Sequence, residues 1–285
     1  MKNNVWFVTG ASKGLGLSLV KKLLQEGYRV AATSRNVNEL ETVVGARDDR
    51  FLPLTMNLLD EADVENAIKK SAAHFGRIDV VVNNAGYGLV GGLEELTDAE
   101  ARANFDVNVF GALNVIRKTL PYMRRQRAGH IFNIASVGGF VGTFPGFGIY
   151  CATKFAMHGF TESLAAEVKP FGIQATVVSP GYFRTNFLDS SSLQVPAKPM
   201  KEYKLVRESQ NTHQFNINGK QMGDPEKAAS VLIEVAAMEE APLHLFLGAD
   251  AYEFAEQKMN WLKDSMLSVK DLATATAFEA DVVEN

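Results

Sequence analysis

A tyrosine and a lysine, Tyr150 and Lys154, stand four residues apart in the stretch G-I-Y-C-A-T-K-F that begins at Gly148. On a helix this spacing places both side chains on one face, close enough to interact. A neighbouring ammonium group favours the phenolate form of a phenol, so it lowers the phenol pKa from its usual value of about 10. The pair is therefore a candidate for general acid–base chemistry in which Tyr150 exchanges the proton.

A glycine-rich turn follows the first apolar segment and opens a helix. It reads T-G-A-S-K-G-L-G, from Thr9 to Gly16. Glycines let the backbone approach a pyrophosphate closely, and the positive end of the helix with its free N–H groups favours the negative charge. We expect a dinucleotide to bind at Gly10, Ser12, Lys13, Gly14, Leu15 and Gly16. A Walker-type phosphate loop is excluded, because its Lys-Ser/Thr pair is missing after the last glycine.

The residues after the second expected strand indicate which dinucleotide binds. NAD sites usually place an acidic residue about 20 positions after the glycine turn, where it holds the ribose 2′-hydroxyl. The strand here ends in A-A-T-S-R-N, without an acid, and includes Ser34 and Arg35. Arg35 and Lys13 can instead clamp a 2′-phosphate. The sequence therefore favours NADP(H) over NAD(H).

Short apolar segments alternate with longer helix-like segments, which predicts a mostly parallel sheet with helices on both faces. Strands are expected at Val5–Thr9, Arg29–Thr33, Phe51–Met56, Ile78–Asn83, His130–Ala135, Gln174–Ser179 and His244–Leu247. Helices are expected at Leu15–Gln25, Val37–Val44, Glu61–Phe75, Asp98–Arg125, Tyr150–Val168, Pro225–Ala237 and Ala251–Leu267. Thr97–Glu100 reads as a capping box, and Asp224-Pro225 as an N-cap before a proline. We predict a doubly wound, Rossmann-type α/β fold with about seven strands.

No linker, repeat or low-complexity tract divides the chain, so we expect a single domain over residues 1–268. Residues 182–223 form a long stretch outside the alternation, and loops of that length are usually lids or binding loops. Residues 269–285 read as a C-terminal tail that is either mobile or covers a neighbouring chain.

Composition excludes several classes of protein. The 285 residues are 46% hydrophobic, which is enough for a packed core, and the net charge of −4 argues against a general nucleic-acid or membrane-surface binder. No apolar run is long enough to span a membrane, and the single cysteine and the absence of a signal peptide suit the cytoplasm. No metal site is expected, because no metal-ligand spacing is present among His74, His130, His158, His213 and His244.

Further motifs follow in order along the chain. Asn83-Asn84-Ala85-Gly86 follows the fourth expected strand, Asn108 lies in the next helix and Ser136 follows the fifth strand. Tyr150 and Lys154 form Y-x-x-x-K, and Pro180-Gly181 with Thr185 forms P-G-x-x-x-T. With the glycine turn, these motifs resemble the short-chain dehydrogenase/reductase family in its compact single-domain subgroup, over about Val5–Thr185. The sequences around Tyr150 and Pro180 resemble its hydroxysteroid- and retinol-dehydrogenase-like branch.

The resemblance implies a catalytic tetrad of Asn108, Ser136, Tyr150 and Lys154. In this tetrad Tyr150 is the acid for carbonyl reduction or the base for alcohol oxidation, and Ser136 holds the substrate oxygen. Lys154 reaches the nicotinamide ribose, and Asn108 holds a water in a proton relay. The resemblance also implies cofactor contacts from Asn57, Leu58, Asn84, Ala85, Gly86, Tyr150, Lys154, Pro180, Gly181, Phe183 and Thr185.

Two positions depart from the family pattern. Asn57 stands where the family commonly has an aspartate that contacts adenine, although an amide also donates and accepts hydrogen bonds. The interval between Ser136 and Tyr150 is one residue longer than is usual in the family.

Aromatic residues are expected to wall the substrate site, which suits an apolar carbonyl compound or alcohol. The expected wall comprises Phe140, Phe144, Phe147, Tyr182 and Phe187, and the long segment also carries Phe183, Tyr203 and Phe215.

Two alternative functions stay open. One is a 3-oxoacyl-thioester reductase, with a basic patch of Lys198, Lys201, Lys204 and Arg207 at the site mouth. The other is a non-catalytic dinucleotide-sensing protein. Family members commonly pair the helices that hold Asn108 and Tyr150, so we expect a homodimer or homotetramer.

Overall fold

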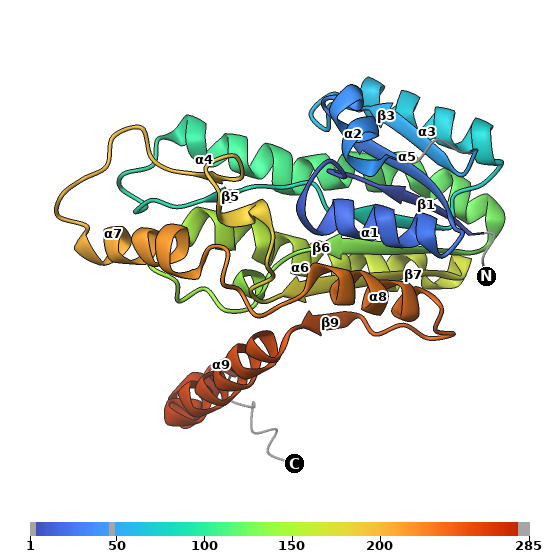
Figure 1. Ribbon diagram of the computed structural model, residues 1–285. Helices are drawn as coiled ribbons and strands as arrows, with labels where there is room; N and C mark the ends of the chain where they lie inside the picture. The colour runs from blue at the N-terminus through green and yellow to red at the C-terminus, as the bar shows by residue number, and fades with distance from the viewer. Residues whose placement is uncertain (1–3, 46–48, 279–285) are drawn as a thin grey trace, which may run out of the picture.

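Seven parallel strands form the central sheet in the order β3-β2-β1-β4-β6-β7-β9 in the computed structural model, which describes residues 4–45 and 49–278 (Figure 1). The strands are β1 (Val5–Val8), β2 (Arg29–Ser34), β3 (Phe51–Thr55), β4 (Val80–Asn83), β6 (Gly129–Ile134), β7 (Ile173–Pro180) and β9 (His244–Leu247). The order reverses between β1 and β4, since β2 and β3 lie on one side and the later strands on the other. The doubly wound fold predicted from the sequence is therefore confirmed.

Helices cover both faces of this sheet. One face carries α1 (Gly14–Gln25), α2 (Val37–Val44) and α8 (Pro225–Ala236), and the other carries α3 (Glu61–Phe75), α5 (Gly111–Gln126) and α6 (Gly148–Val168). Successive strand residues point to opposite faces. Trp6 therefore packs with the first set of helices and Phe7 with the second, and both are buried. Each strand of this kind needs apolar residues on both sides, which explains the uninterrupted apolar run V-W-F-V.

Both expected helix starts are confirmed. In the capping box at the start of α4 (Asp98–Phe105), the Thr97 hydroxyl accepts from the Glu100 amide at 3.2 Å, and the Glu100 carboxylate accepts from the Thr97 amide at 2.8 Å. Asp224 caps α8 by accepting from the Glu226 amide at 2.9 Å, with proline at the first helical position. These local bonds satisfy amide groups that have no partner inside the helix.

The helix expected over Asp98–Arg125 is not one regular α-helix. A π-helical segment, Asp106–Phe110, separates α4 from α5, and Asn108 lies at its centre. A π segment places an extra residue in the turn and is frequent at functional sites. Apolar spacing over the whole helix did not indicate it.

Residues 182–223 are more regular than the sequence indicated. They contain the short strand β8 (Leu193–Gln194), helix α7 (Lys204–Asn211) and a π-helical segment, Thr212–Ile217. Strand β8 pairs in parallel with β5 (Gly88–Leu89), which follows the N-N-A-G motif. This pairing anchors the long segment beside the carboxyl edge of the main sheet.

The last described helices are α9 (Ala249–Ser268) and α10 (Lys270–Thr274). Helix α9 packs through Ala251 and Ala255 and then projects away from the sheet (Figure 1). Of the expected tail, residues 279–285 lie outside the described residues. Within the described ranges, none of the helices combines the length and the apolar character that a membrane crossing requires.

Candidate active site

A cavity of about 780 Å³ opens at the carboxyl edge of the sheet. Parallel strands bring the segments that follow them to the same edge, which is where open α/β sheets bind ligands. The cavity wall includes almost every cofactor-site residue expected from the sequence: Gly10, Ser12, Lys13, Gly14, Leu15, Ser34, Arg35, Asn57, Leu58, Asn84, Ala85, Gly86, Tyr150, Lys154, Pro180, Gly181, Phe183 and Thr185. Gly16 is the exception.

The glycine turn is held against the N-N-A-G segment. Gly10 has a φ of +64°, and a Cβ there would lie 2.7 Å from the Ala85 Cα, so only glycine fits. The Thr9 hydroxyl accepts from the Asn84 and Ala85 amides, both at 3.1 Å. The Asn84 side chain donates to the carbonyls of Thr9 and Gly10 at 2.9 and 3.0 Å. Asn84 thus fixes the turn as well as lining the cavity.

Gly16 has a packing role. It is buried, and a Cβ there would lie 2.7 Å from the Gly10 carbonyl oxygen and would collide with the Asn84 amide group. The residue therefore lets α1 pack closely on the turn, and it does not border the cavity itself.

The end of the cavity beside α1 fits the phosphates of a dinucleotide. No side chain caps the first turn of α1, and that turn contains no acidic residue. Its free amide groups and positive dipole end are therefore available to an anion. Lys13 precedes the helix and lines the cavity with Arg35. Burial and, next in size, the positive charge of Arg35 lower the pKa of Lys13, so the two cations repel each other.

Tyr150, Lys154 and Ser136 border one region of the cavity, although only the first two come from the same helix. Tyr150 and Lys154 are 7% and 4% exposed, and the Lys154 nitrogen lies 5.8 Å from the centre of the Tyr150 ring. The Lys154 nitrogen also donates to the Ile134 carbonyl at 2.9 Å, which ties the side chain to the end of β6. Ser136 caps a short 3-10 turn by accepting from the Gly138 amide at 3.0 Å.

The pKa of Tyr150 differs from the sequence-based expectation. Burial raises the Tyr150 pKa, and a hydrogen bond with the Ser136 hydroxyl lowers it by a smaller amount. Lys154 is not among the groups that shift it. Burial also lowers the pKa of Lys154 to about 7, so near neutral pH its charge is only partial. The sequence predicted that Lys154 lowers the Tyr150 pKa, and this prediction is wrong for the chain alone. Both side chains are buried, and burial disfavours the charged form of each. Tyr150 is protonated at neutral pH.

Asn108 lies behind this wall and does not line the cavity. Its Oδ1 accepts from the Tyr87 amide at 3.0 Å, and its Nδ2 donates to the Tyr87 carbonyl at 3.0 Å and to Thr153 Oγ1 at 3.1 Å. A Cβ at Gly86 would lie 3.0 Å from Asn108 Oδ1 and 3.6 Å from the Lys154 nitrogen. Asn108 therefore approaches Lys154 across Gly86.

Four of the five aromatic residues expected in the substrate wall line the cavity, namely Phe144, Phe147, Tyr182 and Phe187. Phe140 does not. The turn Val137–Gly139 carries it away, and its ring packs edge-on against Phe246 with centroids 5.4 Å apart.

Two other aromatic residues of the long segment also lie outside the cavity wall. Tyr203 donates to the Glu94 carboxylate, and Phe215 is 71% exposed.

Cys151 lines the cavity, and burial raises the pKa of its thiol to about 12, which keeps the thiol protonated.

His213 is a cavity residue that sequence reasoning missed. Its Nε2 lies 2.8 Å from the Tyr182 hydroxyl, and its Nδ1 lies 2.7 Å from the Ser209 carbonyl. Burial lowers its pKa, so the ring is neutral at pH 7. The residue occurs in the π-helical segment of 182–223, where no local pattern marks it.

Comparison with known proteins agrees with this geometry. The family model for short chain dehydrogenase matches residues 4–195, which is more than half of the chain. The chain belongs to the short-chain dehydrogenase family. It is accordingly an oxidoreductase with a Rossmann-type nucleotide-binding fold.

Relatives of this short-chain dehydrogenase match nearly the whole chain. Oxidoreductase BOA17 of Botryotinia fuckeliana is 35% identical over 96% of this chain and 99% of its own. The 3-ketodihydrosphingosine reductase of Bacteroides thetaiotaomicron is 32% identical over 94% of this chain and 96% of its own. The solved structure of a short-chain dehydrogenase from Streptomyces avermitilis superposes with a TM-score of 0.88 at 34% identity, covering 96% of this chain and all of that one.

Proposed function

We propose that this short-chain dehydrogenase interconverts an apolar ketone or aldehyde and its alcohol with NADP(H), with Tyr150 as the general acid or base. The observation that supports this most is the placement of Tyr150, Ser136 and Lys154 on a cavity wall that continues to the glycine turn. Bound nicotinamide would supply the hydride. The protein must then position the carbonyl and manage one proton.

In the reductive direction, Tyr150 donates its phenolic proton to the carbonyl oxygen. Its raised pKa keeps that proton available at neutral pH. The Ser136 hydroxyl holds the same oxygen and stabilises the negative charge that develops there. Lys154 holds the nicotinamide ribose and, when protonated, stabilises the phenolate that remains. Asn108, behind Gly86, would hold a water that relays protons to and from Lys154.

The preference for NADP(H) is part of the proposal. Burial and, next in size, the positive charge of Arg35 lower the pKa of Lys13, and a 2′-phosphate between the two cations would relieve their repulsion. The last residues of β2 offer no carboxylate for a free 2′-hydroxyl.

The substrate is proposed to be apolar, as in the hydroxysteroid and retinol dehydrogenases, because the apolar rings of Phe144, Phe147 and Phe187 line the cavity. A relative named as a 3-ketodihydrosphingosine reductase supports the proposal of a ketone substrate.

A 3-oxoacyl thioester is the second candidate substrate, because Lys198, Lys201 and Lys204 of the expected basic patch are exposed. Arg207, the fourth member of that basic patch, is instead paired with the buried Glu95 at 2.6 Å.

Assembly as a homodimer or homotetramer is also proposed. Phe110 and Phe155 are 52% and 43% exposed on the segments that hold Asn108 and Tyr150, so pairing of these helices would cover them.

A cytoplasmic location is proposed as well. The chain has a single cysteine and a negative net charge, which suit the reducing cytoplasm.

A substrate panel tests the proposal. Aliphatic and aromatic ketones, aldehydes and 3-oxoacyl thioesters are incubated with the protein and NADPH or NADH, and loss of reduced nicotinamide is followed by absorbance. Turnover of apolar ketones with NADPH supports the main proposal, and selective turnover of acyl thioesters supports the second candidate. Tight NADPH binding without any turnover would instead indicate a dinucleotide sensor.

A further inference from the structure

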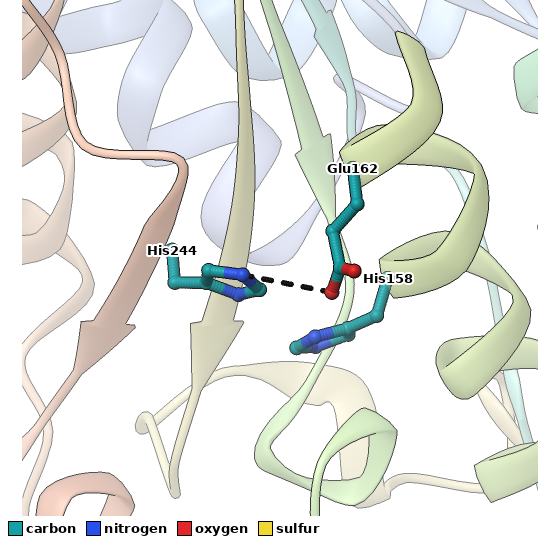
Figure 2. A group of neighbouring side chains, drawn as sticks. All are labelled: His158, Glu162 and His244. Carbon is teal, nitrogen blue, oxygen red and sulfur yellow. Dashed lines mark ion pairs between the residues drawn. The ribbon is translucent and has the colours of Figure 1, made fainter. Parts of the chain in front are cut away.

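Three potential metal ligands meet outside the active-site cavity. His158 and Glu162 lie one turn apart on α6, and His244 is the first residue of β9 (Figure 2). One donor atom from each residue lies within 4.8 Å of the other two. The His244 Nε2 and a Glu162 carboxylate oxygen are 3.5 Å apart, and the two imidazole centres are 5.7 Å apart. The fold creates this group, since β9 pairs with β7 and α6 packs on β7.

One ring nitrogen of His158 is held by a buried partner, as is usual in metal-binding histidines. Its Nε2 lies 3.0 Å from the hydroxyl of Ser179, which is 1% exposed, and in the described part of the chain no hydrogen bond engages its Nδ1. Ligating histidines typically use one ring nitrogen for the metal and donate the other N–H to a fixed acceptor. Burial holds the pKa of His158 at about 4, with smaller contributions from His244 and Lys154, so the ring is neutral at pH 7.

The other two side chains can adjust. His244 and Glu162 have side chains that are 38% and 52% exposed, so a metal ion can arrive from solvent without opening the core. Zinc bonds of about 2.0–2.1 Å to nitrogen and oxygen place neighbouring tetrahedral ligands roughly 3.3 Å apart. Closing the present spacing to that value requires rotation of the two exposed side chains, while His158 stays fixed by Ser179.

We propose that His158, Glu162 and His244 bind a divalent transition metal, with Zn²⁺ as the preferred ion. Two imidazoles and one carboxylate are a donor set that Zn²⁺ takes readily, with water completing the shell, whereas Mg²⁺ prefers oxygen ligands alone. A simple ion pair between His244 and Glu162 accounts for only two of the three residues. The metal would join α6 to the edge strand β9. It would act on stability, because the group lies outside the cavity wall.

Zinc titration of the untagged full-length chain, after treatment with a chelator and buffer exchange, tests this site. Calorimetry should show one saturable Zn²⁺ site per chain at pH 7.5, and the unfolding temperature should rise with Zn²⁺ but not with Mg²⁺. Co²⁺ bound in its place should give visible absorption bands that report its coordination. The absence of saturable Zn²⁺ binding would overturn the proposal.

Variants assign the site to its residues. His244→Ala and Glu162→Gln change exposed positions and should each weaken Zn²⁺ binding by at least ~10-fold with the fold retained. Ser179→Ala should weaken it by ~10- to 100-fold, because the orienting bond to His158 is lost. His74→Ala removes an exposed histidine elsewhere and should bind Zn²⁺ like the unaltered chain. Equal Zn²⁺ affinity in His244→Ala, Glu162→Gln and the unaltered chain would refute the assignment.

Discussion

The Lys154 nitrogen lies 5.8 Å from the ring centre of Tyr150, and neither side chain is more than 7% exposed. The two groups therefore lie in the same poorly solvated wall. Burial there disfavours the phenolate form of Tyr150 and the ammonium form of Lys154. A protonated phenol beside a partly charged lysine is the arrangement that a proton donor needs before reaction, and the roles proposed for both residues follow from it.

Removal of the Tyr150 hydroxyl should abolish turnover without loss of nucleotide binding. In Tyr150→Phe the ring keeps its contacts with Phe147 and Phe187, whose centres lie 6.2 and 5.8 Å away, so the cavity should keep its shape. We expect kcat to fall by at least ~10²-fold, the usual contribution of a positioned acid or base, and the NADPH Kd to change by less than about twofold. Steady-state assays and fluorescence titration measure the two quantities. A parallel loss of NADPH binding would give Tyr150 a structural role instead.

Burial of Lys154 should make stability depend on pH. Its pKa is about 7 in the folded chain against an ordinary 10.5. Between these values the unfolded chain holds a proton at Lys154 that the folded chain lacks, so the free energy of unfolding rises with pH. The Lys154 contribution should approach about 1.4 kcal/mol per pH unit between pH 7.5 and 9.5.

Lys154→Met is the matched variant for this measurement, because it keeps an unbranched apolar stem and removes the ionisable group. Urea unfolding at several pH values should give a rising free energy for the unaltered chain and a flatter profile for Lys154→Met. Parallel profiles for the two proteins would contradict a lowered Lys154 pKa.

Much of the nucleotide site could be predicted because its signals are local. Gly10 needs a positive φ and space beside Ala85, and Tyr150 and Lys154 share a helix face through their spacing alone. The Phe140 position could not be predicted, because the turn after Ser136 decides which way the chain leaves the cavity. The Tyr150 pKa also escaped prediction, since spacing reports the neighbouring charge and not the burial that outweighs it.

Residues brought together by tertiary contacts gave no sequence signal. His213 reaches Tyr182 because the long segment is anchored by the pairing of β8 with β5. His158 and His244 are far apart along the chain and meet only because β9 joins the sheet beside β7. The expectation of no metal site rested on linear spacing, which cannot register such pairing.

Reversal of the charge at Arg35 should change the choice of cofactor. Arg35→Asp removes a cation from the cavity wall and, in the proposed cofactor site, places a carboxylate beside the ribose 2′-hydroxyl. The ratio of kcat/KM for NADPH over NADH should fall by roughly 10- to 100-fold, as expected for one charge-assisted hydrogen bond. Arg127→Asp makes the same charge change at the distant end of α5 and should leave the ratio unaltered. If both variants keep the original ratio, the phosphate clamp is wrong.

The Tyr182 hydroxyl should support substrate binding through His213. Its 2.8 Å contact with the His213 Nε2 joins two parts of the long segment at the cavity wall. Tyr182→Phe keeps the ring and removes this contact, which is worth about 0.5–1.5 kcal/mol. We expect kcat/KM for an apolar ketone to fall by roughly 2- to 10-fold, mostly through KM, with the KM for NADPH unchanged. Tyr203→Phe removes a hydroxyl that bonds Glu94 outside the cavity and serves as the control. Equal effects of the two substitutions on the ketone KM would show that the segment responds to any lost hydroxyl, and would remove the substrate-binding role from Tyr182 and His213.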